Sequence, residues 1–164
     1  MLSQSIATVL AAKEIREVLT TVPSATVAEA AALMSRKDVG AVVVCVGSKV
    51  EGIFTERDLL RRVVTEGRDP KATKISAVMS PNVRAVASDT GIEDALRLMV
   101  EHRYRHLLVQ DGEDLVGVIS IRDLMFAQIR PDQAPPHEGR PGVLRARTEE
   151  ALRAVQPLDR AGPT

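Results

Sequence analysis

The feature that most constrains the fold of this 164-residue chain is an internal repeat. The stretch GIFTERDLL begins at Gly52, and the similar stretch GVISIRDLM begins at Gly117, 65 residues later. At that shift residues 20–64 align with residues 85–129 without a gap, and most core positions exchange one aliphatic residue for another. Similarity at a fixed spacing indicates one supersecondary unit used twice. The sequence therefore predicts two similar units.

Each unit is expected to run strand, helix, strand, strand, helix. A short strand leads into a Ser/Thr/Asp turn suited to cap a helix, and Val27, Ala30 and Met34 then recur at helical spacing. The apolar run AVVVCV and the following EGIFT predict two strands, and the second helix begins at the hydroxyl residue of the repeated stretch. One such unit alone buries its faces poorly. We therefore expect an α+β fold in which the two units pack sheet to sheet about a pseudo-twofold axis, with the helices outside.

The remaining segments differ from the two units in composition. The stretch from Arg130 to Gly142 is dense in Pro and Gly, which is typical of a flexible linker. The polar stretch between the units contains a short helix around Ile75–Met79 by the same reading. The expected segments are an N-terminal helix with its linker (1–19), the first unit (20–64), the inter-unit linker (65–84), the second unit (85–130) and a flexible tail (131–164).

Composition bounds the class of protein and its partners. Basic and acidic residues balance at 22 each, so the net charge gives no reason to expect a nucleic acid as partner. No stretch approaches the ~20 apolar residues that cross a bilayer. The N-terminus lacks the basic start and long apolar run of a secretory signal. We therefore expect a cytoplasmic protein that does not bind a membrane.

The sequence offers little that supports catalysis. It contains no Gly-x-Ser-x-Gly elbow, no Gly-rich phosphate loop and no Cys/His cluster. Its one cysteine, Cys45, lies in an apolar run and is expected to be a buried small hydrophobe. His102 and His106 lie four residues apart without a carboxylate or cysteine to complete a metal site. We therefore expect neither enzymatic activity nor a bound metal.

The repeated stretch itself has the chemistry of a ligand site. Its hydroxyl residue, Thr55 or Ser120, stands where a strand ends and a helix begins, beside N–H groups that attract anions. The acid, Asp58 or Asp123, follows three residues later on the same helical face and suits the two hydroxyls of a ribose. The glycine lets the backbone come close to a ligand without a side chain in the way. The alternative is structural, because Thr-x-x-Asp also makes a capping box.

These residues resemble the motif of the cystathionine-β-synthase (CBS) domain, which reads glycine, apolar, any residue, Thr or Ser, two further residues, then Asp. The resemblance covers residues 1–130. It implies two clefts between the sheets, in which the hydroxyl contacts phosphate and the acid contacts the ribose of an adenosine ligand. By that resemblance Thr55 and Asp58 serve one site, and Ser120 and Asp123 serve the other.

The resemblance also implies contacts outside the motif. Two strands of each unit would offer backbone and an apolar wall to the base. Arg103 and Arg105 alternate along a strand-like stretch, so we expect both to face the same side, with two solvated arginines as the alternative. Tyr104 is expected to stack on a base, with a position in the core or at the rim as the alternative. The contacts carried over in this way are Thr21, Val22, Ala41, Val42, Val86, Ala87, Arg103, Arg105, His106 and Arg122.

Together these features favour a non-enzymatic sensor that requires no cofactor. AMP, ADP or ATP would bind between the units as a regulatory ligand and change what a homodimer, formed through the helices, presents to a further protein partner. The two clefts are unequal, because DVGAVVV is slim and neutral whereas YRHLLV is bulky and cationic, so one cleft should bind better. The alternative is a dimerisation or docking scaffold with empty clefts.

Overall fold

The structure is a computed structural model that describes residues 4–13 and 18–131, and it contains two three-stranded sheets. In each sheet the middle strand runs parallel to the first strand and antiparallel to the third. The expected tail lies, beyond Pro131, outside the described residues. The strands are β1 (Thr20–Thr21), β2 (Ala41–Val46) and β3 (Lys49–Thr55) in the first sheet, and β4 (Ala85–Val86), β5 (His106–Asp111) and β6 (Asp114–Ser120) in the second.

The helices follow the same repeated order. The segment η1 is a π-helix and η2 is a 3-10 helix. Helix α2 begins with a capping box between Thr26 and Glu29, as the Ser/Thr-rich turn before it predicts. No helix within the described ranges is long and apolar enough to cross a lipid bilayer. The helices are α1 (Ile6–Ala12), α2 (Val27–Lys37), α3 (Glu56–Asp58), η1 (Leu59–Val64), η2 (Ile75–Ala77), α4 (Ile92–His102) and α5 (Ile121–Ile129).

The two units repeat each other in backbone detail. The three strands and the first long helix of the second unit begin and end 65 residues after those of the first. Asp38 and Arg103, which follow α2 and α4, both adopt the left-handed conformation, with φ of 51° and 57°. A bulge follows Val44 in the first hairpin and Val109 in the second. The predicted repeat and its α+β order of elements are confirmed.

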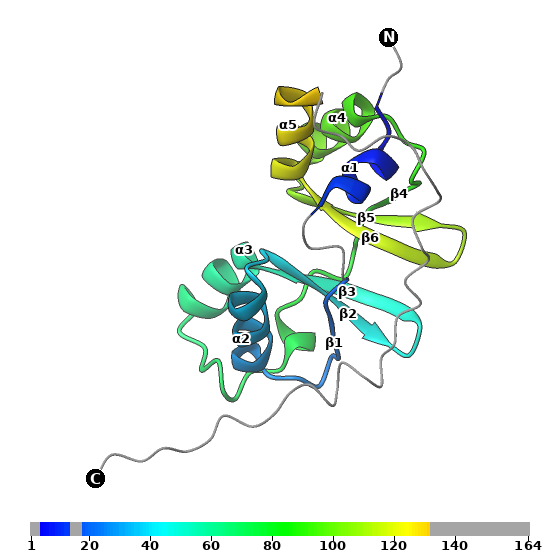
Figure 1. Ribbon diagram of the computed structural model, residues 1–164. Helices are drawn as coiled ribbons and strands as arrows, with labels where there is room; N and C mark the ends of the chain where they lie inside the picture. Colours follow the sequence, from blue (N-terminus) through cyan, green and yellow to red (C-terminus); the bar gives the residue numbers. More distant parts are fainter. Residues whose placement is uncertain (1–3, 14–17, 132–164) are drawn as a thin grey trace.

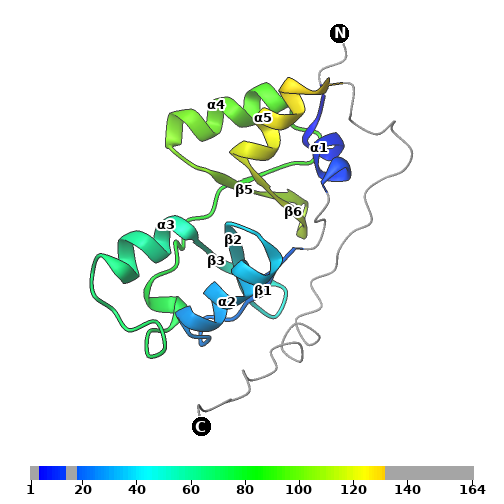
Figure 2. The ribbon, with the colours of Figure 1, turned by 60° about the vertical axis from the view of Figure 1, so that its left-hand side comes forward.

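The two sheets pack against each other. Val43 and Cys45 of β2 form one buried cluster with Leu108 and Leu115 of the second sheet. Figure 2 shows α2 on the outer side of the first sheet, and α4 and α5 on the outer side of the second. The expected sheet-to-sheet packing is therefore confirmed, and the centre of the seam between the units is apolar. Cys45 is the buried hydrophobe that the sequence predicts, with 1% of its surface exposed.

Each unit is completed by a segment that precedes the other unit in the sequence. We call residues 5–11 and 74–80 the leading segments. Ile6 of the first leading segment lies in the core of the second unit, and Ile75 of the second leading segment lies in the core of the first. Figure 1 shows α1 beside α5 and β6, away from the first unit that follows it in the chain. The leading segments are therefore exchanged between the units.

The two leading segments dock in the same way. The backbone N–H of Ile6 donates to the carbonyl of Thr90 at 2.9 Å. The backbone N–H of Ile75 donates to the carbonyl of Ala25, the equivalent position of the first unit, at 2.8 Å. The exchange therefore preserves the internal symmetry of the fold.

The two ends of the described chain also lie together. The side-chain amide of Gln4 donates to the carbonyl oxygen of Pro131 at 3.0 Å. Helix α1 packs along α5 and β6 in the same region. The start of α1 is thus fixed beside the end of α5.

Candidate functional site

The repeated stretch forms a capping box in both units. The backbone N–H of Thr55 donates to Asp58 Oδ2 at 3.0 Å, and the backbone N–H of Asp58 donates to Thr55 Oγ1 at 3.3 Å. In the second unit, Ser120 N–H donates to Asp123 Oδ2 at 2.8 Å, and Asp123 N–H donates to Ser120 Oγ at 3.2 Å. The structural role of the motif is therefore present twice. A ligand that donates hydrogen bonds to Asp58 or Asp123 therefore has to use a carboxylate oxygen that these bonds do not occupy.

The carboxylate of Asp58 has little capacity left. Its Oδ2 also accepts the hydroxyl of Thr55 at 3.1 Å, and its Oδ1 accepts the hydroxyl of Ser80 at 3.2 Å. Arg62 Nε lies 3.6 Å from the same Oδ1. The residue is only 6% exposed. Asp58 therefore fastens the second leading segment to the first unit, and both of its oxygens are occupied.

The equivalent carboxylate, that of Asp123, is more open. Lys13 Nζ lies 3.0 Å from its Oδ2, and 23% of the Asp123 side chain is exposed. The same ammonium donates to the carbonyl of Val118 at 2.9 Å. Within the part of the chain that the structure describes, Oδ1 of Asp123 accepts no hydrogen bond. The two acids of the repeat thus differ in their surroundings, although their caps are alike.

The repeated glycine is required by packing within the chain. A Cβ on Gly52 would lie 2.7 Å from the carbonyl oxygen of Ser80, and a Cβ on Gly117 would lie 2.9 Å from a methyl group of Leu10. Both contacting residues belong to the leading segments. At both glycines the group that approaches closely is therefore the protein's own chain, whereas the sequence analysis expected a ligand there.

The strand starts of the two units meet at one end of the seam. A Cβ on Gly40 would lie 3.3 Å from Glu56 Oε2 and 3.5 Å from His106 Nε2, so a residue of the first unit touches the first residue of β5. His106 is largely buried, and this burial lowers the pKa of its imidazole below the usual value. The charged groups that act on this imidazole are Asp123, which raises the pKa, and Lys13, Arg105 and Arg57, which lower it.

Cations from both units gather around this end of the seam. Loss of solvent around the guanidinium lowers the pKa of Arg57, and repulsion from Arg105 and then Arg61 adds to the effect. Arg57 comes from the first unit and Arg105 from the second, so the fold brings like charges together across the seam. An anion placed between them would relieve this repulsion. We call Lys13, Arg57, Arg105 and His106, together with Asp123, the seam cluster.

The remaining residues that the family resemblance predicts as ligand contacts lie on the first and second strands of each unit and at the start of α5. Thr21 and Val86 are the last residues of β1 and β4, and Val22 and Ala87 follow them. Ala41 is the first residue of β2, in the position that His106 has in β5. The side chain of Val42 lies fully buried in the core of the first unit, and Val86 packs against the core of the second. Arg122 is exposed at the start of α5.

The expectation that Arg103 and Arg105 alternate along one strand is wrong. Arg103 is the left-handed residue that ends α4, and β5 begins only at His106, so Arg103 and Arg105 do not alternate along one strand. The helix continues to His102, and the chain has to reverse sharply before the next strand, as it does at Asp38. Both side chains are exposed, as the alternative of two solvated arginines expects. The charge of Arg105 acts on the imidazole of His106, and Arg103 is not among the charges that do so.

The aromatic residue next to Arg103 has a partner in its own chain. The rings of Tyr104 and His102 stack with their centroids 5.7 Å apart. His102 is therefore engaged away from His106. No group of three His, Cys, Asp or Glu side chains able to hold a metal ion occurs among the residues described.

Three residues of the site escaped the sequence analysis: Lys13, Glu56 and Ser80. Lys13 and Ser80 lie in or next to the leading segments, which correspond to each other as SIATVLA at residues 5–11 and KISAVMS at residues 74–80. Their spacing is 69 residues, and an ungapped comparison at 65 does not align them. The pattern of Ile and Val shared by the two segments was the available signal.

Comparison with known proteins decides the family. A model of the CBS domain matches residues 12–65 and again residues 75–130. The chain belongs to the CBS-domain family. It contains a pair of CBS domains.

Individual CBS-domain proteins resemble the chain over most of its length. It is 36% identical to the CBS domain-containing protein YhcV of Bacillus subtilis over 118 residues, which are 72% of this chain and 84% of YhcV. A structure of a proposed signal-transduction protein with CBS domains from Burkholderia ambifaria is 38% identical, has a TM-score of 0.75, and matches 82% of this chain and 100% of its own. The hexameric CBS-CP12 protein of bloom-forming cyanobacteria is 30% identical, with a TM-score of 0.68 over 77% of this chain and 68% of its own.

Proposed function

We propose that this CBS-domain pair is a non-enzymatic regulatory sensor that binds one adenosine nucleotide, AMP, ADP or ATP, at Asp123 in the seam between its units. The observation that carries the proposal is the carboxylate of Asp123. It keeps one oxygen without a hydrogen bond in the described structure, and it stands among cations contributed by both units. A carboxylate beside a cationic cluster suits a ligand with hydroxyls at one end and phosphate at the other.

In this proposal the ribose and the phosphates of the nucleotide each contact a defined group of the protein. Oδ1 of Asp123 accepts the ribose hydroxyls. The phosphates approach Arg57 and Arg105, whose mutual repulsion an anion offsets. The first N–H groups of α5, next to Ser120, add a positive dipole end. We therefore propose that the nucleotide contacts both units across the seam. Its affinity then depends on the angle between the two units.

We propose a single ligand per chain, because the first-unit acid is already occupied. Asp58 is buried and its two oxygens accept hydrogen bonds from Thr55 and Ser80. A ribose at Asp58 would have to replace those bonds and detach the second leading segment. This assigns the better cleft to the second, more cationic unit.

The proposed output is a change in an assembly of chains. Four large apolar side chains on α4 and α5 are more than half exposed, namely Val100, Met125, Phe126 and Ile129. Exposed apolar side chains gathered on two neighbouring helices are typical of a protein interface. We propose that two copies pair through this helical face, and that ligand binding changes the surface which the dimer offers to a further protein partner.

A specific observation favours a second candidate, a ligand-free scaffold. Both capping boxes satisfy the hydroxyl and the acid of the motif within the chain, and both motif glycines are filled by leading segments. A fold retained only for dimerisation or docking needs nothing more from these residues.

Thermal unfolding with and without nucleotide separates the two candidates. We expect AMP, ADP or ATP at 100 times its dissociation constant to stabilise the protein by about 2.7 kcal/mol, seen as a rise in Tm of a few degrees. Asp123→Asn should abolish this rise. Asp89→Asn, which changes an exposed acid away from the seam cluster, should leave it intact. No rise with any adenine nucleotide in the unaltered protein would support the scaffold.

A further inference from the structure

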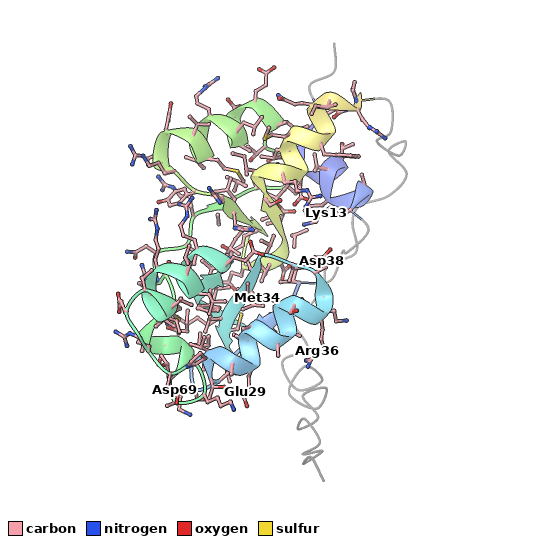
Figure 3. All side chains as sticks on the ribbon, turned by 90° about the vertical axis from the view of Figure 1, so that its left-hand side faces the viewer. Lys13, Glu29, Met34, Arg36, Asp38 and Asp69 are labelled. Atoms are coloured by element: carbon pink, nitrogen blue, oxygen red, sulfur yellow. The ribbon has the colours of Figure 1, made fainter. Side chains whose placement is uncertain are left out.

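Lys13 reaches the carboxylate on which the proposed function depends. It follows the last turn of α1, and Figure 3 shows it below α1, close to the start of α5. Its ammonium lies 3.0 Å from Asp123 Oδ2 and donates to Val118 at 2.9 Å. About a quarter of its side chain is exposed. Lys13 is therefore held by these two contacts and remains partly exposed.

The acid of the first unit has different neighbours. Asp58 accepts the hydroxyl of Ser80 from the second leading segment at 3.2 Å, and its cation, Arg62, comes from the helical segment that the acid itself begins. A full positive charge that reaches the acid from the end of α1 occurs, of these two sites, at Asp123. It is a property of this chain that the symmetry of the fold does not require.

The ammonium of Lys13 also lies where the phosphate is expected. Asp123 Oδ2 accepts both Lys13 Nζ and the backbone N–H of Ser120, at 3.0 and 2.8 Å. The cation is therefore next to the start of α5, the end of a helix that favours negative charge. A phosphate bound there would meet the ammonium and the first N–H groups of the helix together.

We infer that Lys13 is a specificity-determining residue of the Asp123 site, which selects phosphorylated nucleosides over the free nucleoside. The inference rests on the proposed function. A ribose bound at Asp123 Oδ1 leaves the ammonium of Lys13 paired with Oδ2. An unphosphorylated ligand gives this ammonium no further partner, whereas a phosphate gives it a second anionic partner. Lys13 thus stabilises a bound nucleotide and not a bound nucleoside.

Titration calorimetry with AMP and adenosine on the full chain tests this inference. We expect the unaltered protein to bind AMP more tightly than adenosine. Lys13→Met should weaken AMP binding about tenfold, which is ~1.4 kcal/mol, and should leave adenosine binding unchanged or stronger. Lys13→Arg, which keeps the charge, should keep most of the preference for AMP. Lys49→Met is the matched control, because Lys49 pairs with Glu51 on an exposed hairpin and should have no effect.

The outcomes separate the inference from the proposed function. If the unaltered protein binds AMP but Lys13→Met leaves the ratio of AMP to adenosine affinity unchanged, the inference is overturned and the sensor proposal stands. If Lys13→Arg loses the preference as fully as Lys13→Met, the inference is also overturned, because the charge is then not what selects. If the unaltered protein binds neither compound, the inference fails, and the proposed function fails with it when ADP and ATP do not bind either.

Discussion

At the scale of single residues, equivalent positions of the repeat have acquired different neighbours. Asp58 and Asp123 cap their helices in the same way. The second leading segment then places the hydroxyl of Ser80 against Asp58, whereas Lys13, which follows the first leading segment, places its ammonium against Asp123. One acid is enclosed by hydrogen bonds and the other keeps an exposed oxygen. The difference arises from residues outside the motif.

This difference predicts unequal costs for removing the two acids. Asp58→Ala leaves the N–H of Thr55 and the hydroxyl of Ser80 without their buried acceptor, and we expect a loss of about 3 kcal/mol in the free energy of unfolding. Asp123→Ala removes a more exposed cap and an ion pair, and we expect a loss of about 1 kcal/mol. Urea denaturation of both variants measures the difference. Equal losses would show that Asp58 is not the structural acid of the pair.

At the scale of elements, the exchange of leading segments is the main feature that local sequence patterns did not reveal. A helix within residues 1–19 and a short helix near Ile75 follow from apolar spacing, and both are present. Spacing along one segment reports which face is buried, but it does not report which unit buries it. That information lies in contacts between residues far apart in the sequence.

The exchange predicts that damage to α1 is felt in the distant unit. Ile6 is fully buried in the core of the second unit, so Ile6→Ala should cost about 2–5 kcal/mol. By hydrogen exchange, amides of β5 and β6 should lose protection before those of β2 and β3. Ile75→Ala is the matched control, and it should produce the reverse order. Loss of protection in β2 and β3 first, with Ile6→Ala, would contradict the exchanged packing.

The second helix of each unit shows a further limit of local patterns. The repeated stretch predicts a helix in both, and a helix is present in both. In the first unit it continues as the π-helix η1, in which Arg62 donates to the carbonyls of Val78 and Met79 at 3.2 and 2.8 Å. The wider winding accompanies contacts with the second leading segment. A tertiary contact of this kind leaves no mark on the periodicity of the helix itself.

At the scale of the whole molecule, the predicted and observed folds agree because the repeat restricts the possibilities strongly. Two units with apolar sheets and one shared seam have few ways to pack. The seam cluster was predicted only in part: Asp123, Arg105 and His106 were included through the family resemblance, whereas Lys13 was missed. The role of Lys13 depends on which unit α1 packs against, and that depends on the exchanged leading segment.

The outer helical face predicts the state of assembly. Val100 on α4 is 69% exposed, and Phe126 and Ile129 on α5 are 56% and 74% exposed. If two copies pair there, Phe126→Asp should convert a dimer into a monomer of 17.7 kDa, because a buried unpaired charge opposes association. Light scattering after size exclusion measures the mass. The control is Val46→Asp, at an exposed apolar position on β2, which should leave the dimer intact. If Phe126→Asp leaves the mass of the dimer unchanged, this helical face is not the interface.

The exchange of leading segments also bears on how such a chain can be divided. Residues 18–80 contain the first unit and the leading segment that packs into it, as one continuous length of backbone. The second unit is assembled from two lengths of backbone, residues 4–13 and 83–131, whose outer ends touch through Gln4 and Pro131. A cut between the two units would leave the first unit intact and would separate the second unit from its leading segment. A circular permutant that joins Pro131 to Gln4 and opens new termini after Ala12 would make each unit continuous in sequence. The same fold is therefore compatible with two orders of its segments along the chain.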